Sequence, residues 1–250
     1  MPGVNALTPL TLVMTGLEDW ADVGRVSAGD PVRRRVDDAL AAAKLASTQT
    51  VANTIFPAET WERAKRGGGR ARLYARHARV VERFGLRNRA NLRGLYFGRM
   101  TGAGRGAQAV NQVEHLITAY KAGVRRPTAL QLVVFNPGHD HTLERRRGFP
   151  CLQSVGFTPL GPGKLGMTAV YPCQYLFQRG LGNYIGLIRL GRFVAHELDL
   201  DLSQLTCWGG KLTVDKGTTR RDLRRLARCP QPVTANPTQP ATTPGGDGRV

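Results

Sequence analysis

Apolar residues recur every three or four positions in several stretches of the chain, which is the spacing of one helix face. The first stretch covers residues 31–47. It follows Asp30-Pro31, where the aspartate is suited to cap a helix and the proline to begin it. The same spacing predicts further helices over 58–65, 70–84, 108–122 and 183–198.

Runs of β-branched and apolar residues bounded by turn residues predict strands. They cover 48–56, 129–135, 151–157 and 165–171, and 205–214 is expected to form a strand pair around Gly209-Gly210. Residues 94–99 are expected to form an aromatic turn. These elements indicate an α/β fold with a mixed sheet flanked by helices, in a single domain over 1–228. Residues 229–250, rich in Pro, Thr and Gly, are expected to be a disordered tail.

The charge balance points to an anionic partner. Basic residues outnumber acidic residues by 36 to 18, which gives a net charge of +18. This balance favours a phosphorylated small molecule or nucleic acid as ligand. The alternative is a genome-wide preference for arginine, which needs no partner. Aromatic residues are 7% of the chain and scattered, which disfavours a stacking platform for single-stranded nucleic acid.

Cysteine spacing and the first residues bear on the compartment. The four cysteines contain no CxxC pair, which argues against a zinc site and for reduced thiols in a cytoplasmic protein. His139 and His141 are interpreted as part of a solvated loop rather than as metal ligands. No apolar run is long enough to cross a bilayer, and the first residues lack the basic region of a signal peptide. We therefore expect neither a metal nor a membrane partner.

The stretch 125–157 concentrates the candidate chemistry. It begins with Arg125 and Arg126, continues through a polar loop that contains three consecutive arginines, and reaches Cys151 directly after Phe149-Pro150. Because nearby cations favour the thiolate over the thiol, Cys151 is a candidate nucleophile. The alternative is a small buried core cysteine, which is the commoner role of a single cysteine.

Several short motifs follow one another in a recognisable order. They are Asn111-Gln112, Arg125-Arg126, Asn136-Pro137, Phe149-Pro150-Cys151, Gly163-Lys164-Leu165, Tyr171, Gly180, Asn183 and Gly209-Gly210. This succession resembles the thymidylate synthase family over about residues 110–215. Each motif alone is weak, and their order carries the resemblance.

The resemblance implies a thymidylate synthase-like fold and a homodimer. It implies that Cys151 adds as a thiolate to C6 of a pyrimidine nucleotide, after which C5 takes a one-carbon unit from 5,10-methylenetetrahydrofolate. The product would carry a methyl group, or a hydroxymethyl group if water is captured instead. Arg125 and Arg126 match the arginine pair that reaches the nucleotide phosphate in the other subunit. Asn183 lies near the position whose amide reads the pyrimidine edge.

The chain departs from the family pattern at positions that bind substrate. Tyr171 is followed by Pro172-Cys173-Gln174 instead of the phosphate-binding arginine and serine, and Lys211-Leu212-Thr213 replaces the His-x-Tyr that holds the ribose. Asn183 is one residue out of register, with a helix N-cap as its alternative role. No acid occurs at 70–73, where the catalytic glutamate is expected. The open alternatives for that glutamate are Glu59, Glu62 and Glu82.

These departures leave two further interpretations open. In one, the protein binds a nucleotide or nucleic acid through phosphate contacts on the same fold and performs no chemistry. In the other, it is an unrelated cysteine enzyme in which His139, Asp140 or His141 assists Cys151.

Overall fold

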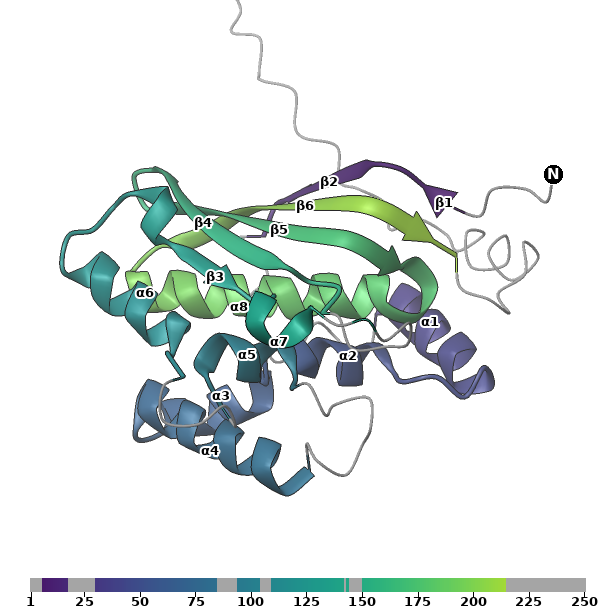
Figure 1. Ribbon diagram of the computed structural model, residues 1–250, viewed down its shortest axis with the longest axis horizontal. Coiled ribbons are helices and arrows are strands. Elements are labelled where there is room, and N and C mark those ends of the chain that lie inside the picture. Colours follow the sequence, from purple (N-terminus) through teal and green to yellow (C-terminus); the bar gives the residue numbers. More distant parts are fainter. Residues whose placement is uncertain are drawn as a thin grey trace, which may run out of the picture. The chain divides into compact units, whose positions relative to one another are not determined.

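The computed structural model describes residues 6–17, 30–84, 94–103, 109–141, 143 and 150–214. They all belong to one structural unit, Met1–Thr218, and a second unit, Thr219–Val250, lies outside the described residues. The described residues form a six-stranded mixed sheet with helices packed against one of its faces (Figure 1). The predicted mixed α/β class is therefore confirmed, whereas the predicted tail at 229–250 lies outside the described residues.

The elements have the following bounds. The strands are β1 (Ala6–Leu7), β2 (Leu10–Thr15), β3 (Gln131–Val133), β4 (Ser154–Gly161), β5 (Lys164–Tyr175) and β6 (Asp201–Thr213). The helices are α1 (Pro31–Ala42), α2 (Thr48–Ile55), α3 (Ala58–Lys65), α4 (Gly69–Phe84), α5 (Tyr96–Thr101), α6 (Gln112–Lys121), α7 (Pro137–Asp140) and α8 (Leu181–Leu198). A 3₁₀ turn, Pro127–Ala129, precedes β3, and a π-helical turn, Leu176–Gly180, joins β5 to α8.

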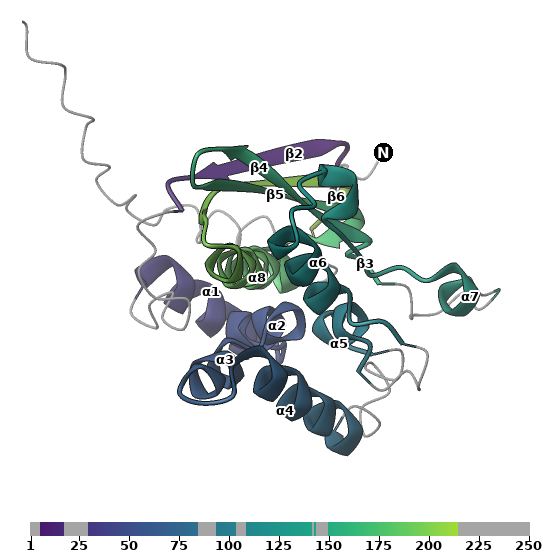
Figure 2. The ribbon, with the colours of Figure 1, turned by 90° about the vertical axis from the view of Figure 1, so that its left-hand side faces the viewer.

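The strand order is β1-β6-β5-β4-β3, and β2 also pairs with β6, on the same edge as β1. Strands β4 and β5 form an antiparallel hairpin, whereas β5 and β6 run parallel. A parallel pair needs a crossover connection, and α8 provides it by running along the sheet (Figures 1 and 2). Helices α8 and α6 lie next to the sheet, and α2, α3, α4 and α5 lie beyond them (Figure 2).

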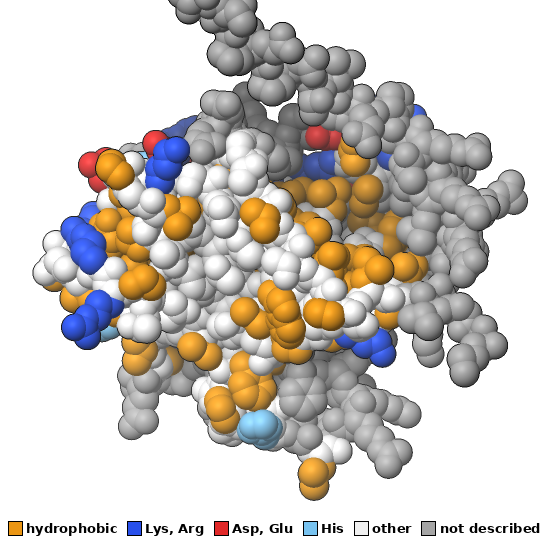
Figure 3. All heavy atoms as spheres, turned by 90° about the horizontal axis from the view of Figure 1, so that it is seen from above, with side chains coloured by type: hydrophobic (Ala, Val, Ile, Leu, Met, Phe, Trp, Pro, Cys, Tyr) orange, Lys and Arg blue, Asp and Glu red, His pale blue; other side chains and the backbone are white. Residues whose placement is uncertain are grey.

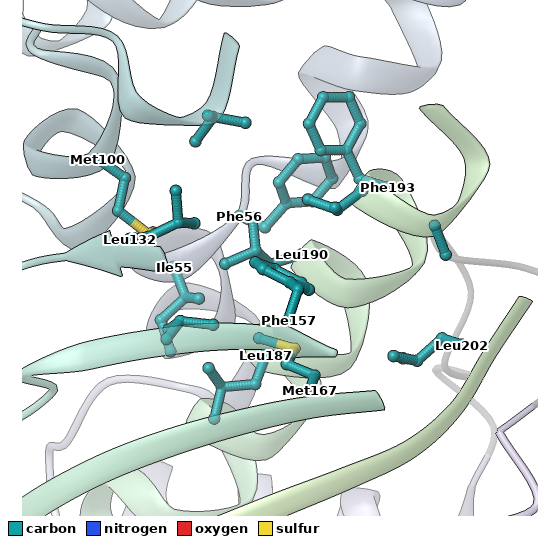
Figure 4. Close-up of a cluster of buried hydrophobic side chains, with 14 of the residues drawn as sticks. Ile55, Phe56, Met100, Leu132, Phe157, Met167, Leu187, Leu190, Phe193 and Leu202 are labelled. Atoms are coloured by element: carbon teal, nitrogen blue, oxygen red, sulfur yellow. The ribbon is translucent and has the colours of Figure 1, made fainter. Parts of the chain in front are cut away.

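The main core lies between the sheet and α8 (Figure 4). Phe56 stacks on Phe193 of α8 at 5.0 Å between ring centroids and meets Phe97 of α5 edge-on at 5.4 Å. Phe157 and Met167 approach from the neighbouring strands β4 and β5 (Figure 4). Because α8 is covered on nearly all sides, it is apolar around most of its circumference.

Residues 48–56 were expected to form a strand, and this prediction is wrong, because they form α2. The Ser47 side chain caps the helix by accepting a hydrogen bond from the N–H of Thr50. Two glycines of α8 let α2 approach closely. A Cβ at Gly182 would lie 2.6 Å from the Val51 Cβ, and one at Gly186 would lie 2.8 Å from the Ala52 carbonyl oxygen. Tertiary packing here outweighs the strand propensity of β-branched residues.

Other predictions were wrong in part. The aromatic turn at 94–99 is the first part of α5, and the strand pair at 205–214 is the single strand β6, which continues through Gly209-Gly210. The strand expected at 129–135 shortens to β3, and β1 and β2 were not foreseen. The helix predicted over 58–65 is α3 with the predicted ends, and the other four predicted helices and the strands near 151–157 and 165–171 are present with shifted ends.

A helix with the length and hydropathy needed to span a membrane is not found among the described residues.

Candidate functional site

Cys151 lies at a bend three residues before β4, where the chain enters the sheet. It is partly buried and packs against the edge of the core. The next residue, Leu152, is fully buried and fixes this entry point. The backbone N–H of Gln153 then donates to the Val170 carbonyl at 2.9 Å, which ties the entry to β5.

Tyr96 is held against this bend. It is the first residue of α5, and its hydroxyl oxygen accepts hydrogen bonds from the backbone N–H groups of Cys151 and Leu152. The same hydroxyl hydrogen-bonds the Cys151 sulfur. Burial raises the pKa of Tyr96 to about 12, so the phenol keeps its proton at neutral pH and can donate it.

The charge environment of Cys151 differs from the expected one. Burial raises the pKa of the Cys151 thiol, and the neighbouring Cys173 raises it further. Arg179 and the hydrogen bond from Tyr96 lower this pKa, but burial is the largest influence. The resting group is therefore a thiol. Among the described residues, the arginine that acts on Cys151 is Arg179, in the π-helical turn; the three arginines at 145–147 lie outside the described residues.

A set of buried polar groups lies next to the Tyr96–Cys151 pair. The Tyr171 hydroxyl and the Gln174 Nε2 are both buried and have no hydrogen-bond partner among the described residues. The Gln174 Oε1 accepts a hydrogen bond of 2.9 Å from the Tyr184 hydroxyl. Tyr171 is close enough to Cys151, Tyr96 and Tyr184 for each of these groups to raise its pKa, although burial raises it most. A buried donor without a partner costs about 1–3 kcal/mol, so this set is suited to bind a polar ligand.

Arg125 and Arg126 are not brought to Cys151 within one chain. They precede β3, and Cys151 precedes β4, which is antiparallel to β3, so they lie beyond opposite ends of this strand pair. The Arg125 guanidinium stacks 3.6 Å from the centre of the Tyr120 ring and donates to the Tyr120 carbonyl oxygen. Arg126 is exposed at the start of the 3₁₀ turn.

Asn183 is buried in the first turn of α8. The helix begins at Leu181, so the alternative role of Asn183 as an N-cap is wrong. Its neighbour Tyr184 is the residue whose side chain reaches Gln174 beside the site. Reading of the pyrimidine edge by Asn183 stays a prediction.

The acidic candidates lie elsewhere. Glu59 interacts with the buried Arg189, and Glu62 pairs with Lys65 at 2.9 Å. Asp140 is bound by the Arg99 guanidinium at 2.6 and 2.9 Å and accepts from the Asn136 N–H. Both side chains of this ion pair are almost fully buried, so the pair is structural and does not supply Cys151 with a base.

A pocket of about 420 Å³ opens beside this ion pair, at the end of β3. Its lining includes Arg99, Gln112 and Asn136 but not Cys151. Gln112 spans β3 from the side: its Nε2 donates to the Val133 carbonyl, and its Oε1 accepts from the Val133 N–H. The polar groups of the lining are thus largely used by the fold itself. Within the described ranges, no three His, Cys, Asp or Glu side chains are grouped closely enough to hold a metal ion.

Comparison of the chain with protein-family models yields no match, and no curated protein matches it. Tyr96, Tyr184, Gln174 and Arg179 are the site residues that the sequence did not single out. The stretch 94–99 echoes the Tyr-Gly turn of the thymidylate synthase family, and this was the available signal for Tyr96.

Proposed function

We propose that the protein is a divergent thymidylate synthase-like transferase that adds a one-carbon unit to C5 of a pyrimidine nucleotide. Cys151 is the nucleophile in this proposal. The observation that carries it is the Tyr96–Cys151 hydrogen bond beside two buried donors, Tyr171 and Gln174, for which the described part of the chain offers no partner. A thiol, a phenol and free ring-binding donors in one place are the groups that conjugate addition to a pyrimidine requires.

The roles of these groups follow from the chemistry of the ring. The Cys151 sulfur forms a bond to C6 and its proton passes to solvent, while the electrons of the C5–C6 double bond move toward the C4 oxygen. Donors aimed at that oxygen stabilise the developing charge, and the Tyr171 hydroxyl and the Gln174 Nε2 are the free donors available. Tyr96 holds a proton next to the sulfur. An electrophile, which is a proton in the exchange reaction and a one-carbon group in the transfer, then bonds to C5. The original C5 hydrogen leaves to solvent as a proton, and elimination of the Cys151 thiolate from C6 restores the C5–C6 double bond.

The open face of the sheet is the face opposite α8 (Figure 2). It supports the homodimer that the proposed phosphate contacts of Arg125 and Arg126 need. Its outward side chains are mostly small, β-branched or aromatic, and charged residues of the described strands lie near strand ends, at Lys164, Asp201 and Lys211 (Figure 3). On a chain with a net charge of +18, two copies repel each other least across such a face. In this proposal Arg125 and Arg126 bind the nucleotide phosphate of the partner subunit, which agrees with their distance from Cys151 in their own chain.

The one-carbon donor enters through the resemblance alone. The amino and N–H groups of a pterin ring are donors that a carboxylate would accept. No described residue is assigned to 5,10-methylenetetrahydrofolate, and exchange of the C5 hydrogen does not need it.

The proposal is tested by hydrogen exchange at C5, which needs the thiol addition but not the donor. Tritium release from C5-labelled dUMP, dCMP, UMP and CMP is measured with the native chain and with the Cys151→Ser variant. Release from at least one nucleotide, lost in the variant, is expected. A 5-fluoropyrimidine nucleotide should then leave a mass adduct on Cys151. Absence of both release and adduct with all four nucleotides contradicts the proposal.

A second candidate is a nucleotide- or nucleic-acid-binding protein on the same fold without catalysis. The raised pKa of the Cys151 thiol favours it, because a protonated sulfur is a poor nucleophile. The net charge of +18 favours it as well. In this case binding of nucleic acid weakens steeply with salt, because phosphate contacts release counterions. Two measurements together separate the candidates. Tritium release is expected only from the enzyme, and nucleic-acid affinity that falls steeply between low and physiological salt, without release, is expected from the binding protein.

A further inference from the structure

Two free cysteines lie on neighbouring strand segments at the candidate site. Cys173 is in β5 and is exposed, and Cys151 precedes β4 and is partly buried. Each is a free thiol. In the resemblance to thymidylate synthases, Cys173 stands at a departure from the pattern, so the family assigns it no role.

The register of the β4–β5 ladder brings these cysteines together. Ser154 pairs with Val170, and the pairing proceeds one for one as far as Pro159 and Leu165. The last pair of the ladder is Ser154–Val170, and Cys151 lies at a bend beyond it. Carried three residues further, the same register would place Cys151 opposite Cys173. The Gln153 N–H also bonds the Val170 carbonyl, which allows a shift of one residue and keeps Cys151 beside the Pro172-Cys173 segment.

The separation that this register implies would fit a disulfide. Directly opposed residues of an antiparallel pair have Cα atoms about 4.5–5.5 Å apart, and a disulfide requires about 4.4–6.8 Å between Cα atoms. The two sulfurs also interact electrostatically, because Cys173 raises the pKa of Cys151. Cys207 is different: it is buried in β6 and has its ladder neighbours Leu12 and Ala169 on either side.

We propose that Cys151 and Cys173 form a reversible intramolecular disulfide, so that the site carries an oxidisable thiol pair. The oxidant is a hydroperoxide. The exposed Cys173 thiol attacks the peroxide, forms a sulfenic acid and releases an alcohol or water. The Cys151 sulfur then attacks the Cys173 sulfur, the S–O bond breaks, and the hydroxide leaves with the Cys151 proton as water. Two thiols are oxidised, one peroxide is reduced, and a dithiol reverses the change.

The test uses a full-length chain in which Cys207→Ala and Cys229→Ala leave the pair as its cysteines. After treatment with hydrogen peroxide, intact mass is expected to fall by two hydrogen atoms, and both titratable thiols are expected to disappear. Peptide mapping should link the segments that contain Cys151 and Cys173, and dithiothreitol should restore both thiols. The matched control is the same chain with the additional substitution Cys151→Ser. In it, peroxide is expected to oxidise Cys173 to the sulfinic acid or to link two chains through Cys173.

Several outcomes overturn the proposal. They are an oxidised chain that keeps one free thiol, a link only between two chains, or sulfinic acid on Cys173 at the rate of the Cys151→Ser control. The circular dichroism spectrum of each variant checks that it is folded.

The effect of the disulfide on reactivity rests on the proposed function. Oxidised protein should form no adduct with a 5-fluoropyrimidine nucleotide, and reduced protein should regain it. If neither form makes an adduct but the disulfide forms, the transferase proposal fails and the thiol pair stands. If the adduct forms equally in both, the thiol pair fails and the transferase proposal stands.

Discussion

The Tyr96 hydroxyl hydrogen-bonds the Cys151 sulfur while it accepts the N–H groups of Cys151 and Leu152. A helix start and a strand entry more than fifty residues apart in the sequence are joined by this one phenol. The contact favours the thiolate, because a hydrogen bond to the charged form lowers a pKa.

Replacing Tyr96 by Phe removes this hydrogen bond and raises the pKa of Cys151 further. A hydrogen bond contributes about 1 kcal/mol, so alkylation of Cys151 by iodoacetamide at pH 7 should slow by about fivefold. The rate is followed by peptide mass spectrometry in a chain in which Cys173→Ser leaves Cys151 as the reactive site thiol. Tyr175→Phe, at an exposed position of β5, is the control and should leave the rate unchanged. An unchanged rate in Tyr96→Phe contradicts the assignment.

Replacing Arg179 by Gln should also slow this alkylation, because the guanidinium lowers the pKa of Cys151. Arg179 is exposed, so the effect should shrink as salt rises, and Arg179→Lys should retain most of the rate. Arg126→Gln is the control for loss of a positive charge far from the thiol. Equal effects of Arg126→Gln and Arg179→Gln would mean that net charge, rather than position, sets the reactivity.

His77 should make the fold sensitive to acid. Burial lowers its pKa from 6.5 to about 4, and its Nε2 has no hydrogen-bond partner within the described ranges. The unfolded chain therefore binds a proton that the folded chain excludes, so this contribution to stability is present above pH 6.5 and is lost as pH falls toward 4. The loss is about 3 kcal/mol in the free energy of unfolding. Urea unfolding at pH 7 and at pH 4.5 measures it. His77→Phe should remove this part of the pH dependence, and His196→Gln, at an exposed position, should not.

Replacing Gly186 by Ala should destabilise the fold by about 1–3 kcal/mol, because the new methyl overlaps α2. It would meet the Ala52 carbonyl oxygen at 2.8 Å and the Ile55 Cβ at 2.9 Å. Gly180→Ala is the matched control, since its nearest neighbour would be 3.7 Å away and its backbone is already helical. It should be neutral or slightly stabilising. The melting temperatures of both variants measure this difference. Equal melting temperatures would show that α2 and α8 can move apart to accept the new methyl group without loss of stability.

Placing a charge on the open sheet face should break the proposed homodimer. Thr168→Arg puts a cation at an exposed position in the middle of β5. Sedimentation velocity should show dimers for the native chain and monomers for this variant. Val80→Arg, on the exposed face of α4, is the control and should stay dimeric. A native chain that sediments as a monomer at all concentrations contradicts the homodimer.

Periodicity predicted the helices that bury one regular apolar face. It failed for a segment whose secondary structure depends on packing against a distant part of the chain. α1, α3, α4, α6 and α8 were foreseen because each repeats apolar residues at helical spacing. α2 was mistaken for a strand because its β-branched residues were weighed alone, whereas the glycines that accommodate it lie in α8, about 130 residues later. β2 alternates leucine and methionine with threonine and valine, which is a strand pattern, but no strand was predicted there.

The candidate site shows the same division. Cys151 was found because a local motif surrounds it, but its partners come from α5, β5 and the π-helical turn. Arginines close in sequence were expected to act on the thiol, and Arg179 does so from 28 positions away. Such contacts depend on strand register and helix start, which a single sequence does not fix.

Strand β2 pairs with the last strand of the sheet, so that Leu10 lies opposite Gly209. A ribosome must therefore release nearly the whole described chain before the first long strand finds its mate. Until β6 has been synthesised, β2 has no strand to pair with. Closing so wide a loop is slow. During that interval the unpaired edge of β2 is available for pairing with other chains.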